Sequence, residues 1–298
     1  MIDTITELSR LRECILGWRR EGLRIGFVPT MGNLHAGHYS LLALARQHAD
    51  RIVSSVFVNP TQFGPNEDFT RYPRTPEADT SGLEAAGCDA LWLPTVESMY
   101  PFGVDLAVSM RVPGVADVLE GRHRPGHFDG VCTVVARLFN QVQPDVAAFG
   151  KKDFQQLAVI QQMVTDLAYP LTLLRGEIVR ETDGLAMSSR NQYLSAENRV
   201  IATEIHRCLR WMRERLDAGT ARAVVEAEAS LRLTRAGFAV DYAAIRTPDL
   251  VEPGLAEPGL AETDTAAERY ARPGPRVALI AARLGRTRLI DNLEFDLV

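Results

Sequence analysis

The sequence lacks a membrane-spanning segment, a P-loop and a strong charge of either sign. No apolar run reaches the roughly 20 residues that a transmembrane helix needs. No Gly-x4-Gly-Lys-Ser/Thr motif occurs, which disfavours a P-loop nucleoside triphosphatase. The net charge of -5 provides no basic field, which argues against a nucleic-acid partner. We therefore expect a soluble globular protein, with neither nucleic acid nor membrane as a partner.

Cysteine is also scarce, and its spacing is uninformative for metals. The thiols lie far apart along the chain, at Cys14, Cys88, Cys132 and Cys208. Without a CxxC pair they indicate neither a zinc site nor a disulfide framework. Acidic side chains at Asp3, Glu7 and Glu13 are unlike a secretory signal. Buried free thiols in a reducing cytoplasm are the interpretation that we favour.

Apolar runs and helical periodicity alternate over the first 180 residues. Strands are expected at 25–28, 52–58, 90–93 and 146–149, with a further apolar segment at 106–110. Helices are expected at 4–20, from 36 onward, near 76–86, at 131–139 and from 153 onward. This alternation predicts an α/β fold with a doubly wound parallel sheet.

The pattern changes near residue 180. Helices are expected at 196–216 and 221–236, followed by strands at 239–245, 277–282 and 288–290. A Glu-Pro-Gly-Leu-Ala segment at 252–256 is repeated at 257–261, so the stretch 252–274 is predicted to be a surface insertion. We place a small α+β domain at 181–298.

The stretch 28–38 organises the chain, because it passes from a strand through a turn into a helix and carries His35 and His38. A helix N-terminus presents unpaired N–H groups and the positive end of the dipole, which suits phosphate. Gly37, between the histidines, lets a ligand approach the backbone closely. His-x-Gly-His after a strand is similar to the signature of nucleotidylyl-transferring α/β enzymes, in which the imidazoles contact nucleotide phosphates.

Two other interpretations of these histidines remain at this stage. They can be solvated residues at the start of a helix, or two ligands of a metal ion. A zinc site would need further ligands. His123 and His127 are the pair spaced to help, but Pro125 and Gly126 interrupt the helix that would align them.

Further polar loops follow expected strands, where ligands bind in open α/β sheets. Gln62, in the loop 59–66, offers both a donor and an acceptor. In the segment 150–153, Lys152 supplies a charge for phosphate oxygens and Asp153 can cap a helix or hold a ribose hydroxyl. Lys-Lys-Asp alone is more often a solvated turn, but its place between a strand and a helix favours a functional role.

Four blocks in this order resemble the pantoate–β-alanine ligase (pantothenate synthetase) family. They are the stretches 29–38, 57–63, 124–128 with 149–156, and 183–191. The resemblance covers nearly the whole chain and is densest from 25 to 195. It implies ATP-dependent condensation of (R)-pantoate with β-alanine through a pantoyl adenylate. It also implies a Rossmann-like domain at 1–180, a C-terminal lid at 181–298, a magnesium requirement and a homodimer.

The resemblance assigns roles residue by residue. His35, His38, Lys152 and Arg190 are expected to be catalytic, with His38 as the proton donor. Gln62 and Gln156 are expected to bind pantoate, and Gln62 also to lie near β-alanine. The positions expected to bind ATP are Met31, Gly32, Asn33, Leu34, His35, Ala36, Gly37, His38, Gly150, Lys151, Lys152, Asp153, Val179, Met187, Ser188, Ser189 and Arg190. Ser188, Ser189 and Arg190 can grip a triphosphate as pyrophosphate leaves.

The chain departs from the family pattern at two positions. Lys151 stands where the family usually has Glu, so only the backbone is carried over there. Ala78 replaces one of the acidic residues that often follow Tyr-Pro-Arg-Thr-Pro, so we name no protein ligand for magnesium and expect ATP phosphates to hold it. Two alternatives remain: a nucleotidyltransferase that leaves the nucleotide on its product, and a non-catalytic nucleotide-binding protein. The latter has little reason to assemble two histidines, Lys152 and Arg190.

Overall fold

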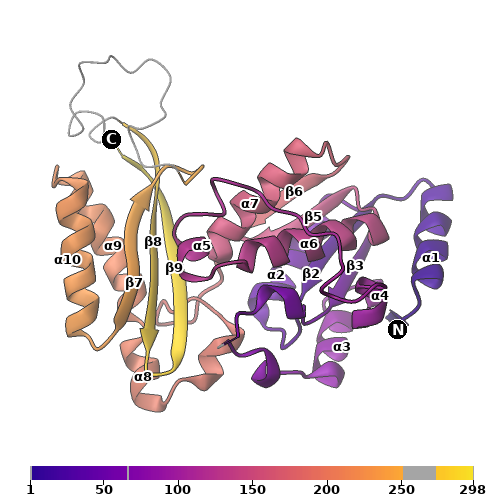
Figure 1. Ribbon diagram of the computed structural model, residues 1–298, viewed down its shortest axis with the longest axis horizontal. Helices are drawn as coiled ribbons and strands as arrows, with labels where there is room; N and C mark the ends of the chain where they lie inside the picture. The colour runs from indigo at the N-terminus through magenta and orange to yellow at the C-terminus, as the bar shows by residue number, and fades with distance from the viewer. Residues whose placement is uncertain (1, 66, 251–272, 298) are drawn as a thin grey trace. The chain divides into compact units, whose positions relative to one another are not determined.

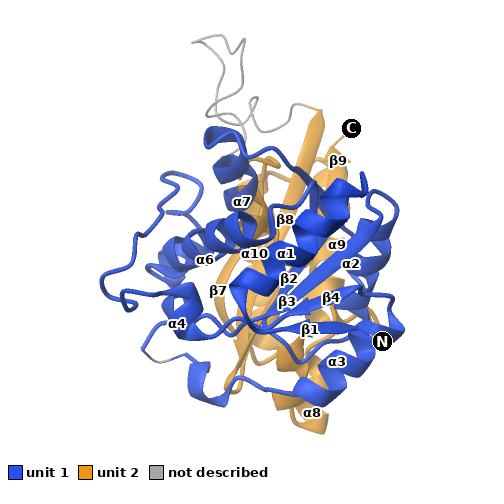
Figure 2. Cartoon of the chain, turned by 90° about the vertical axis from the view of Figure 1, so that its right-hand side faces the viewer, with its two compact units in different colours: residues 1–151, 159–179 blue, residues 152–158, 180–298 orange. Residues whose placement is uncertain are grey.

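The computed structural model describes residues 2–65, 67–250 and 273–297 (Figure 1). The chain forms two compact units (Figure 2). Unit 1 comprises Met1–Lys151 and Val159–Val179, and unit 2 comprises Lys152–Ala158 and Arg180–Val298. The domain boundary expected between residues 180 and 181 stays a prediction.

Unit 1 is built on a six-stranded sheet whose strand pairs are all parallel. Its strands are β1 (Asp3–Ile5), β2 (Ile25–Thr30), β3 (Arg51–Val56), β4 (Ala90–Trp92), β5 (Val146–Gly150) and β6 (Thr172–Gly176). Their order is β1-β4-β3-β2-β5-β6. The central strands are buried almost throughout, as expected for a sheet covered on both faces. This confirms the predicted α/β fold with a Rossmann-like doubly wound sheet.

Helices flank this sheet. They are α1 (Leu8–Arg20), α2 (Ala36–Arg46), α3 (Pro76–Ala85), α4 (Val96–Met99), α5 (Glu120–His123), α6 (His127–Val142) and α7 (Phe154–Asp166), with 3-10 turns η1 (Pro60–Gln62), η2 (Phe69–Arg71) and η3 (Lys151–Asp153). Helix α2 packs on β2, β3, β5 and β6, whereas α1 packs on α6, which contacts β2. Leu41, Leu42 and Ala45 form the buried stripe of α2.

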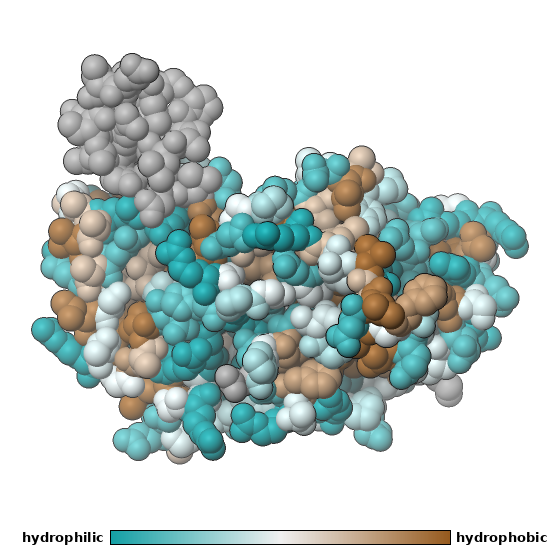
Figure 3. Space-filling model, viewed as in Figure 1, coloured by the Kyte–Doolittle hydropathy of each residue, from teal (hydrophilic) through white to brown (hydrophobic). Residues whose placement is uncertain are grey.

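One expectation for unit 1 needs correction, and two further features were not specified by the sequence. The helix expected at 4–20 begins only at Leu8, because Asp3–Ile5 pairs with β4 as an edge strand. Strand β6 was not expected, since most of its side chains are not buried and its sequence shows no continuous core run. The apolar segment 106–110 is no strand: Leu106 and Val108 are 80% and 76% exposed. Apolar surface is visible near this loop in Figure 3.

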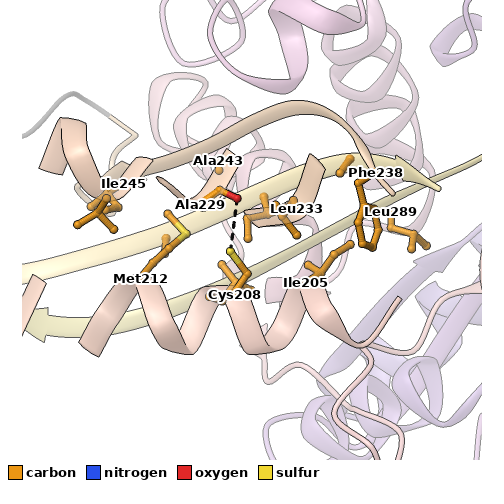
Figure 4. Packing of buried hydrophobic residues seen from close by; sticks show 14 of the residues in the cluster. Ile205, Cys208, Met212, Ala229, Leu233, Phe238, Ala243, Ile245 and Leu289 are labelled. Atoms are coloured by element: carbon orange, nitrogen blue, oxygen red, sulfur yellow. Dashed lines mark hydrogen bonds between the residues drawn. The ribbon is translucent and has the colours of Figure 1, made fainter. Parts of the chain in front are cut away.

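Unit 2 contains a three-stranded antiparallel sheet of β7 (Ala239–Arg246), β8 (Gly274–Leu284) and β9 (Thr287–Leu297). Helices α9 (Glu204–Asp217) and α10 (Arg222–Arg235) bury Cys208, Met212 and Leu233 in its core (Figure 4). The single helix expected at 196–216 is two, α8 (Ala196–Ile201) and α9, with a break at 202–203. The α+β character of this region is confirmed. The predicted insertion 252–274 lies outside the described residues up to 272, and Gly274 already begins β8.

The cysteines fit the expectation of free thiols. All are unpaired, and Cys88, Cys132 and Cys208 are buried, whereas Cys14 is partly exposed. Burial raises the pKa of each of the three buried thiols to about 12. A thiol that stays protonated is a poor nucleophile, so these cysteines serve packing. Within the described ranges no helix is both long and apolar enough to cross a bilayer.

Candidate active site

The strand order places a topological switch point between β2 and β5, at the centre of the unit 1 sheet. The chain runs outward from β2 through β3 to β4, and on the other side of β2 it runs from β5 to β6. Because β2 and β5 are parallel neighbours, the turns that follow them open at the same edge. Ligands of open α/β sheets bind at such a switch point. The predicted phosphate turn 31–38 follows β2, and the predicted segment 150–153 follows β5.

The turn after β2 is held by one buried carboxylate. Asp79, on α3, accepts backbone N–H groups from Asn33 at 2.9 Å and Leu34 at 2.8 Å. The Thr75 hydroxyl donates to the same carboxylate at 3.1 Å. Asn33 and Gly32 both have positive φ, at 50° and 85°. Without the Asp79 anchor such a turn would lose much of what fixes its backbone.

His35 and His38 form a reciprocal cap at the start of α2. The Nδ1 atom of His35 accepts the N–H of Gly37 at 3.1 Å, and Nδ1 of His38 accepts the N–H of His35 at 3.3 Å. A backbone N–H can only donate, so Nδ1 of each ring carries no proton. In a neutral imidazole the proton is then on Nε2. The helix N-terminus therefore presents two Nε2–H donors, whose ring centroids lie 4.2 Å apart.

Gly37 has a packing role beyond the one expected. A Cβ atom at this position would lie 2.9 Å from Cε1 and 3.0 Å from Nδ1 of His35. Glycine therefore leaves room for the imidazole to fold back over the first turn. Val179, another predicted ATP-binding residue, lies on the same side, with its Cβ 3.9 Å from that position.

Gln62 contacts the phosphate turn through Met31. It belongs to η1 after β3 and is 8% exposed. Its Oε1 accepts from Asn59 Nδ2 at 3.1 Å, and its Nε2 donates to Met31 Sδ at 3.3 Å. Two residues predicted to bind different substrates, Gln62 and Met31, are thus in contact within unit 1.

The basic loop 121–128 supports the backbone of Gln62. His127 Nδ1 donates to the Gln62 carbonyl at 2.9 Å, and its Nε2 is 3.0 Å from Arg124 Nη1. Arg124 also makes a bidentate pair with Glu67 at 2.6 and 2.7 Å. Burial and the Arg124 charge lower the pKa of His127 to about 4. A neutral ring that donates from Nδ1 and accepts at Nε2 fits both partners.

The first two residues of the segment 150–153, which follows β5, have different surroundings. Gly150 faces open space where a Cβ would stand, which suits close approach of a ligand. Lys151 pairs with Glu177 at 2.5 Å. The Lys151 side chain is therefore engaged in an ion pair, at the position where the family resemblance carries over only the backbone.

Within unit 2, Lys152 is held through its main chain. Its carbonyl accepts from Nδ2 of the buried Asn292, on β9, at 3.0 Å, and its Nζ lies 3.5 Å from Asp153. This hydrogen bond fixes the backbone from which the Lys152 ammonium group extends. Gln156, on α7, is partly buried. Its proposed contact with pantoate stays a prediction.

The loop that carries Ser188 and Arg190 is anchored at its base. Arg180 pairs with the buried Asp291 at 2.6 and 3.0 Å and donates to the Gly184 carbonyl at 3.1 Å. Ser188 Oγ accepts the N–H of Arg190 at 3.2 Å, which begins the 3-10 turn η4 (Ser189–Tyr193). Met187, Ser188, Ser189 and Arg190 are all partly buried.

Sequence reasoning missed the residues that hold these groups. Asp79 was considered only as part of an acidic run, and Arg180, Asp291 and Asn292 were given no role. One signal existed for the last two: an adjacent Asp-Asn pair stands between the apolar residues Ile290 and Leu293. Nothing in the sequence paired that strand with Lys152, 140 residues earlier.

No protein magnesium site emerges from the described ranges, in which no group of three or more His, Cys, Asp or Glu side chains could hold a metal ion. Ala78 offers no ligand, and both oxygens of Asp79 accept hydrogen bonds within the turn.

Known proteins of one family are similar to this chain over nearly its whole length. A family model described as "Pantoate-beta-alanine ligase" matches residues 3–294. The "Pantothenate synthetase" of Xanthomonas axonopodis pv. citri (strain 306) is 70% identical over 295 residues, which cover 99% of this chain and 100% of the relative. A crystal structure of pantothenate synthetase from Thermus thermophilus has a TM-score of 0.84 at 43% identity, with 98% of this chain and 99% of that chain covered. A pantoate-beta-alanine ligase structure from Francisella tularensis, complexed with beta-gamma ATP and beta-alanine, has a TM-score of 0.78 at 29% identity, covering 98% and 97%. The chain therefore belongs to the pantoate-beta-alanine ligase family.

Proposed function

We propose that this protein is an AMP-forming ligase that condenses (R)-pantoate with β-alanine to give pantothenate, through a pantoyl adenylate. The observation that carries the proposal is the pair of Nε2–H donors at the N-terminus of α2, beside the switch point between β2 and β5. Two further facts support it: the chain's relatives are named pantothenate synthetases, and the Francisella tularensis relative was solved with beta-gamma ATP and beta-alanine.

In the first step, a pantoate carboxylate oxygen attacks the α-phosphorus of ATP and pyrophosphate leaves. Negative charge moves onto the leaving phosphates. His38 and His35 donate hydrogen bonds from Nε2 to the oxygens of the departing pyrophosphate. The donor role assigned to His38 is thus a hydrogen bond to pyrophosphate, because full transfer of the Nε2 proton from a neutral ring would leave an imidazolate. Lys152 and Arg190 supply positive charge. Donors that are fixed before the reaction stabilise such charge without reorganisation.

In the second step, the β-alanine amine attacks the acyl carbon of the adenylate. The carbon–oxygen bond to AMP breaks, an amide forms, and the amine loses a proton. Gln62 and Gln156 hold the pantoyl group, and Gln62 lies near the amine. The adenylate is itself the activated acyl group, so no covalent acyl-enzyme is required.

The nucleotide is bound by both strand-end turns and by the loop in unit 2. Besides the catalytic groups, the proposed ATP contacts are Met31, Gly32, Asn33, Leu34, Ala36, Gly37, Gly150, Lys151, Asp153, Val179, Met187, Ser188 and Ser189. Mg²⁺ binds with ATP, mainly through its phosphates, and would neutralise their charge. The C-terminal region is proposed to act as a lid over the bound substrates.

The proposal includes a cytoplasmic homodimer. Free cysteines fit a reducing compartment. Exposed apolar side chains at Phe102, Leu106 and Val108 offer a surface of the kind used in association. Light scattering of the purified protein tests the dimer: a mass of one chain at working concentration would contradict it.

Isotope exchange tests the reaction. Labelled pyrophosphate should exchange into ATP when pantoate and magnesium are present and β-alanine is absent. Adding β-alanine should then yield pantothenate and AMP in equal amounts. A product that retains the nucleotide would instead identify a nucleotidyltransferase. Exchange that requires β-alanine, together with no enzyme-bound pantoyl adenylate on rapid quench, would contradict the stepwise mechanism.

A further inference from the structure

We propose that Tyr100 is a positioning residue for pantoate recognition, acting through Asn59 on the side-chain amide of Gln62. The inference rests on the proposed function, because it takes Gln62 as a pantoate ligand. Tyr100 follows α4 and is 2% exposed, so it lies behind the site and does not line it. Its effect on substrate would pass along a chain of hydrogen bonds within unit 1.

The orientation of the Asn59 amide is decided by backbone groups. Asn59 Nδ2 donates to the Gly130 carbonyl at 3.2 Å, and a carbonyl can only accept. Asn59 Oδ1 accepts the N–H of Thr61 at 3.4 Å, and an N–H can only donate. A flip of the amide would set donor against donor and acceptor against acceptor. The bond from the Thr61 N–H is long and holds Oδ1 weakly, whereas the Thr61 hydroxyl also donates to Oδ1, at 3.1 Å.

Tyr100 supplies the short bond that the backbone does not. Its hydroxyl donates to Asn59 Oδ1 at 2.6 Å. The Arg137 guanidinium lies 4.9 Å from the centroid of the Tyr100 ring, and Arg137 also binds the Met99 carbonyl at 3.0 Å. Burial raises the pKa of Tyr100, so the phenol stays a donor throughout the neutral range. The ring is therefore fixed in place with its hydroxyl aimed at Asn59.

The consequence falls on Gln62. Its Oε1 is occupied by Asn59 Nδ2, which leaves Nε2 toward Met31 Sδ, a weak acceptor. The group that Gln62 offers to a ligand is then its NH2. An amide donor suits an acceptor oxygen of a hydroxy acid, such as the carboxylate or hydroxyl of pantoate. If Asn59 rotates, Gln62 can turn its carbonyl toward the same site, where it would repel a carboxylate.

Tyr100→Phe isolates this effect, because it removes one hydroxyl and keeps the ring. One lost hydrogen bond corresponds to a change of about 2- to 10-fold. We expect the KM for pantoate to rise by that factor, with the KM for ATP and kcat little changed. Tyr169→Phe is the matched control: it removes another phenol hydroxyl in unit 1 and keeps the ring contact with Phe139. An equal rise in all constants, or a fall in melting temperature with no change in KM, would contradict a positioning role.

A double-mutant cycle tests the route through Gln62. In a Gln62→Ala background, Tyr100→Phe should have no further effect on the KM for pantoate, because the amide that it orients is gone. Undiminished effects in both backgrounds would overturn the inference. Its failure is distinct from failure of the proposed function: a wild-type protein that makes no pantothenate rejects the function, whereas an active protein indifferent to Tyr100→Phe rejects the positioning role alone.

Discussion

Each unit holds its own proposed site residues in place, but the two units do so by different kinds of polar contact. In unit 1, the phosphate turn and Gln62 are held by hydrogen bonds to backbone groups, from the Asp79 carboxylate and the neutral ring of His127. In unit 2, the loop with Ser188 and Arg190 is anchored by a charged pair, Arg180 with Asp291. The first arrangement fixes a turn along its length, whereas the second fixes a loop at its base.

The difference predicts how each region responds to damage. A turn held by several backbone hydrogen bonds can lose one contact and keep its shape. A buried ion pair behaves otherwise, because removing one partner leaves the other charged and without compensation. Substitutions at the anchor of unit 2 should therefore mainly lower the free energy of unfolding. Substitutions at the site residues of unit 1 should mainly change the reaction rate or the pH dependence of stability.

Asp291→Ala should have the largest effect on stability. The side chain of Asp291 is 4% exposed and that of Arg180 is 19% exposed, so the substitution strands a buried guanidinium. We expect a loss of about 3–5 kcal/mol in the free energy of unfolding. Urea unfolding measures it.

Asp183→Ala is the matched control, because Asp183 makes a similar bidentate pair with Arg199 on the surface of the same unit. An exposed pair contributes about 1 kcal/mol or less. Equal losses in the two variants would remove the distinction between the buried pair and the exposed one.

His38→Ala should leave stability nearly intact and abolish most of the chemistry. The substitution removes one Nε2–H donor from the phosphate turn, while the Asp79 contacts that shape the turn remain. Loss of one preorganised donor lowers the rate by about 10²–10³-fold. Pyrophosphate exchange measures this, with the exposed His48→Ala as control. Near-normal exchange by a folded His38→Ala protein would remove the central assignment of the site.

His127 should make the stability of unit 1 depend on pH. The pKa of His127 is about 4 in the folded chain and about 6.5 in an unfolded one. Between these values the unfolded chain binds the additional proton, so stability falls as pH falls from 6.5 to 4, by about 3 kcal/mol in all. His127→Gln should flatten this slope, whereas His48→Gln should not. An unchanged slope in His127→Gln would show that other groups account for the acid sensitivity.

The comparison also shows what the sequence could reveal. The turn after β2 is encoded locally: a buried strand, Gly32 as the breaker, and two histidines at the start of a helix all lie within 14 residues of one another. Pro29 does not end the strand, since β2 continues to Thr30. The same holds for Gln62 after β3. Local periodicity and turn chemistry therefore predicted the fold of unit 1 and the candidate groups at its sheet edge.

The supports could not be predicted, because they come from distant segments. Asp79 reaches the phosphate turn from 45 residues away, and Asp291 reaches Arg180 across 111 residues. A single sequence carries no signal for such pairings. For the same reason β1 and β6 were missed: both are short edge strands, identified by their partners and not by an apolar run.

Asn292→Ala should have the smallest effect, and it sharpens the comparison most. Asn292 and Asp291 are neighbours on β9, but Asn292 binds the Lys152 carbonyl through a neutral hydrogen bond at 3.0 Å. Losing a bond of about 1 kcal/mol should reduce kcat for adenylate formation about fivefold, because the backbone beneath the ammonium group loosens. The KM for pantoate should stay constant, since Gln62 is held independently in unit 1. Asn198→Ala, in the same unit, controls for loss of an amide away from Lys152. If Asn292→Ala instead costs as much stability as Asp291→Ala, the pair on β9 acts as one structural anchor, and charge is not what distinguishes unit 2.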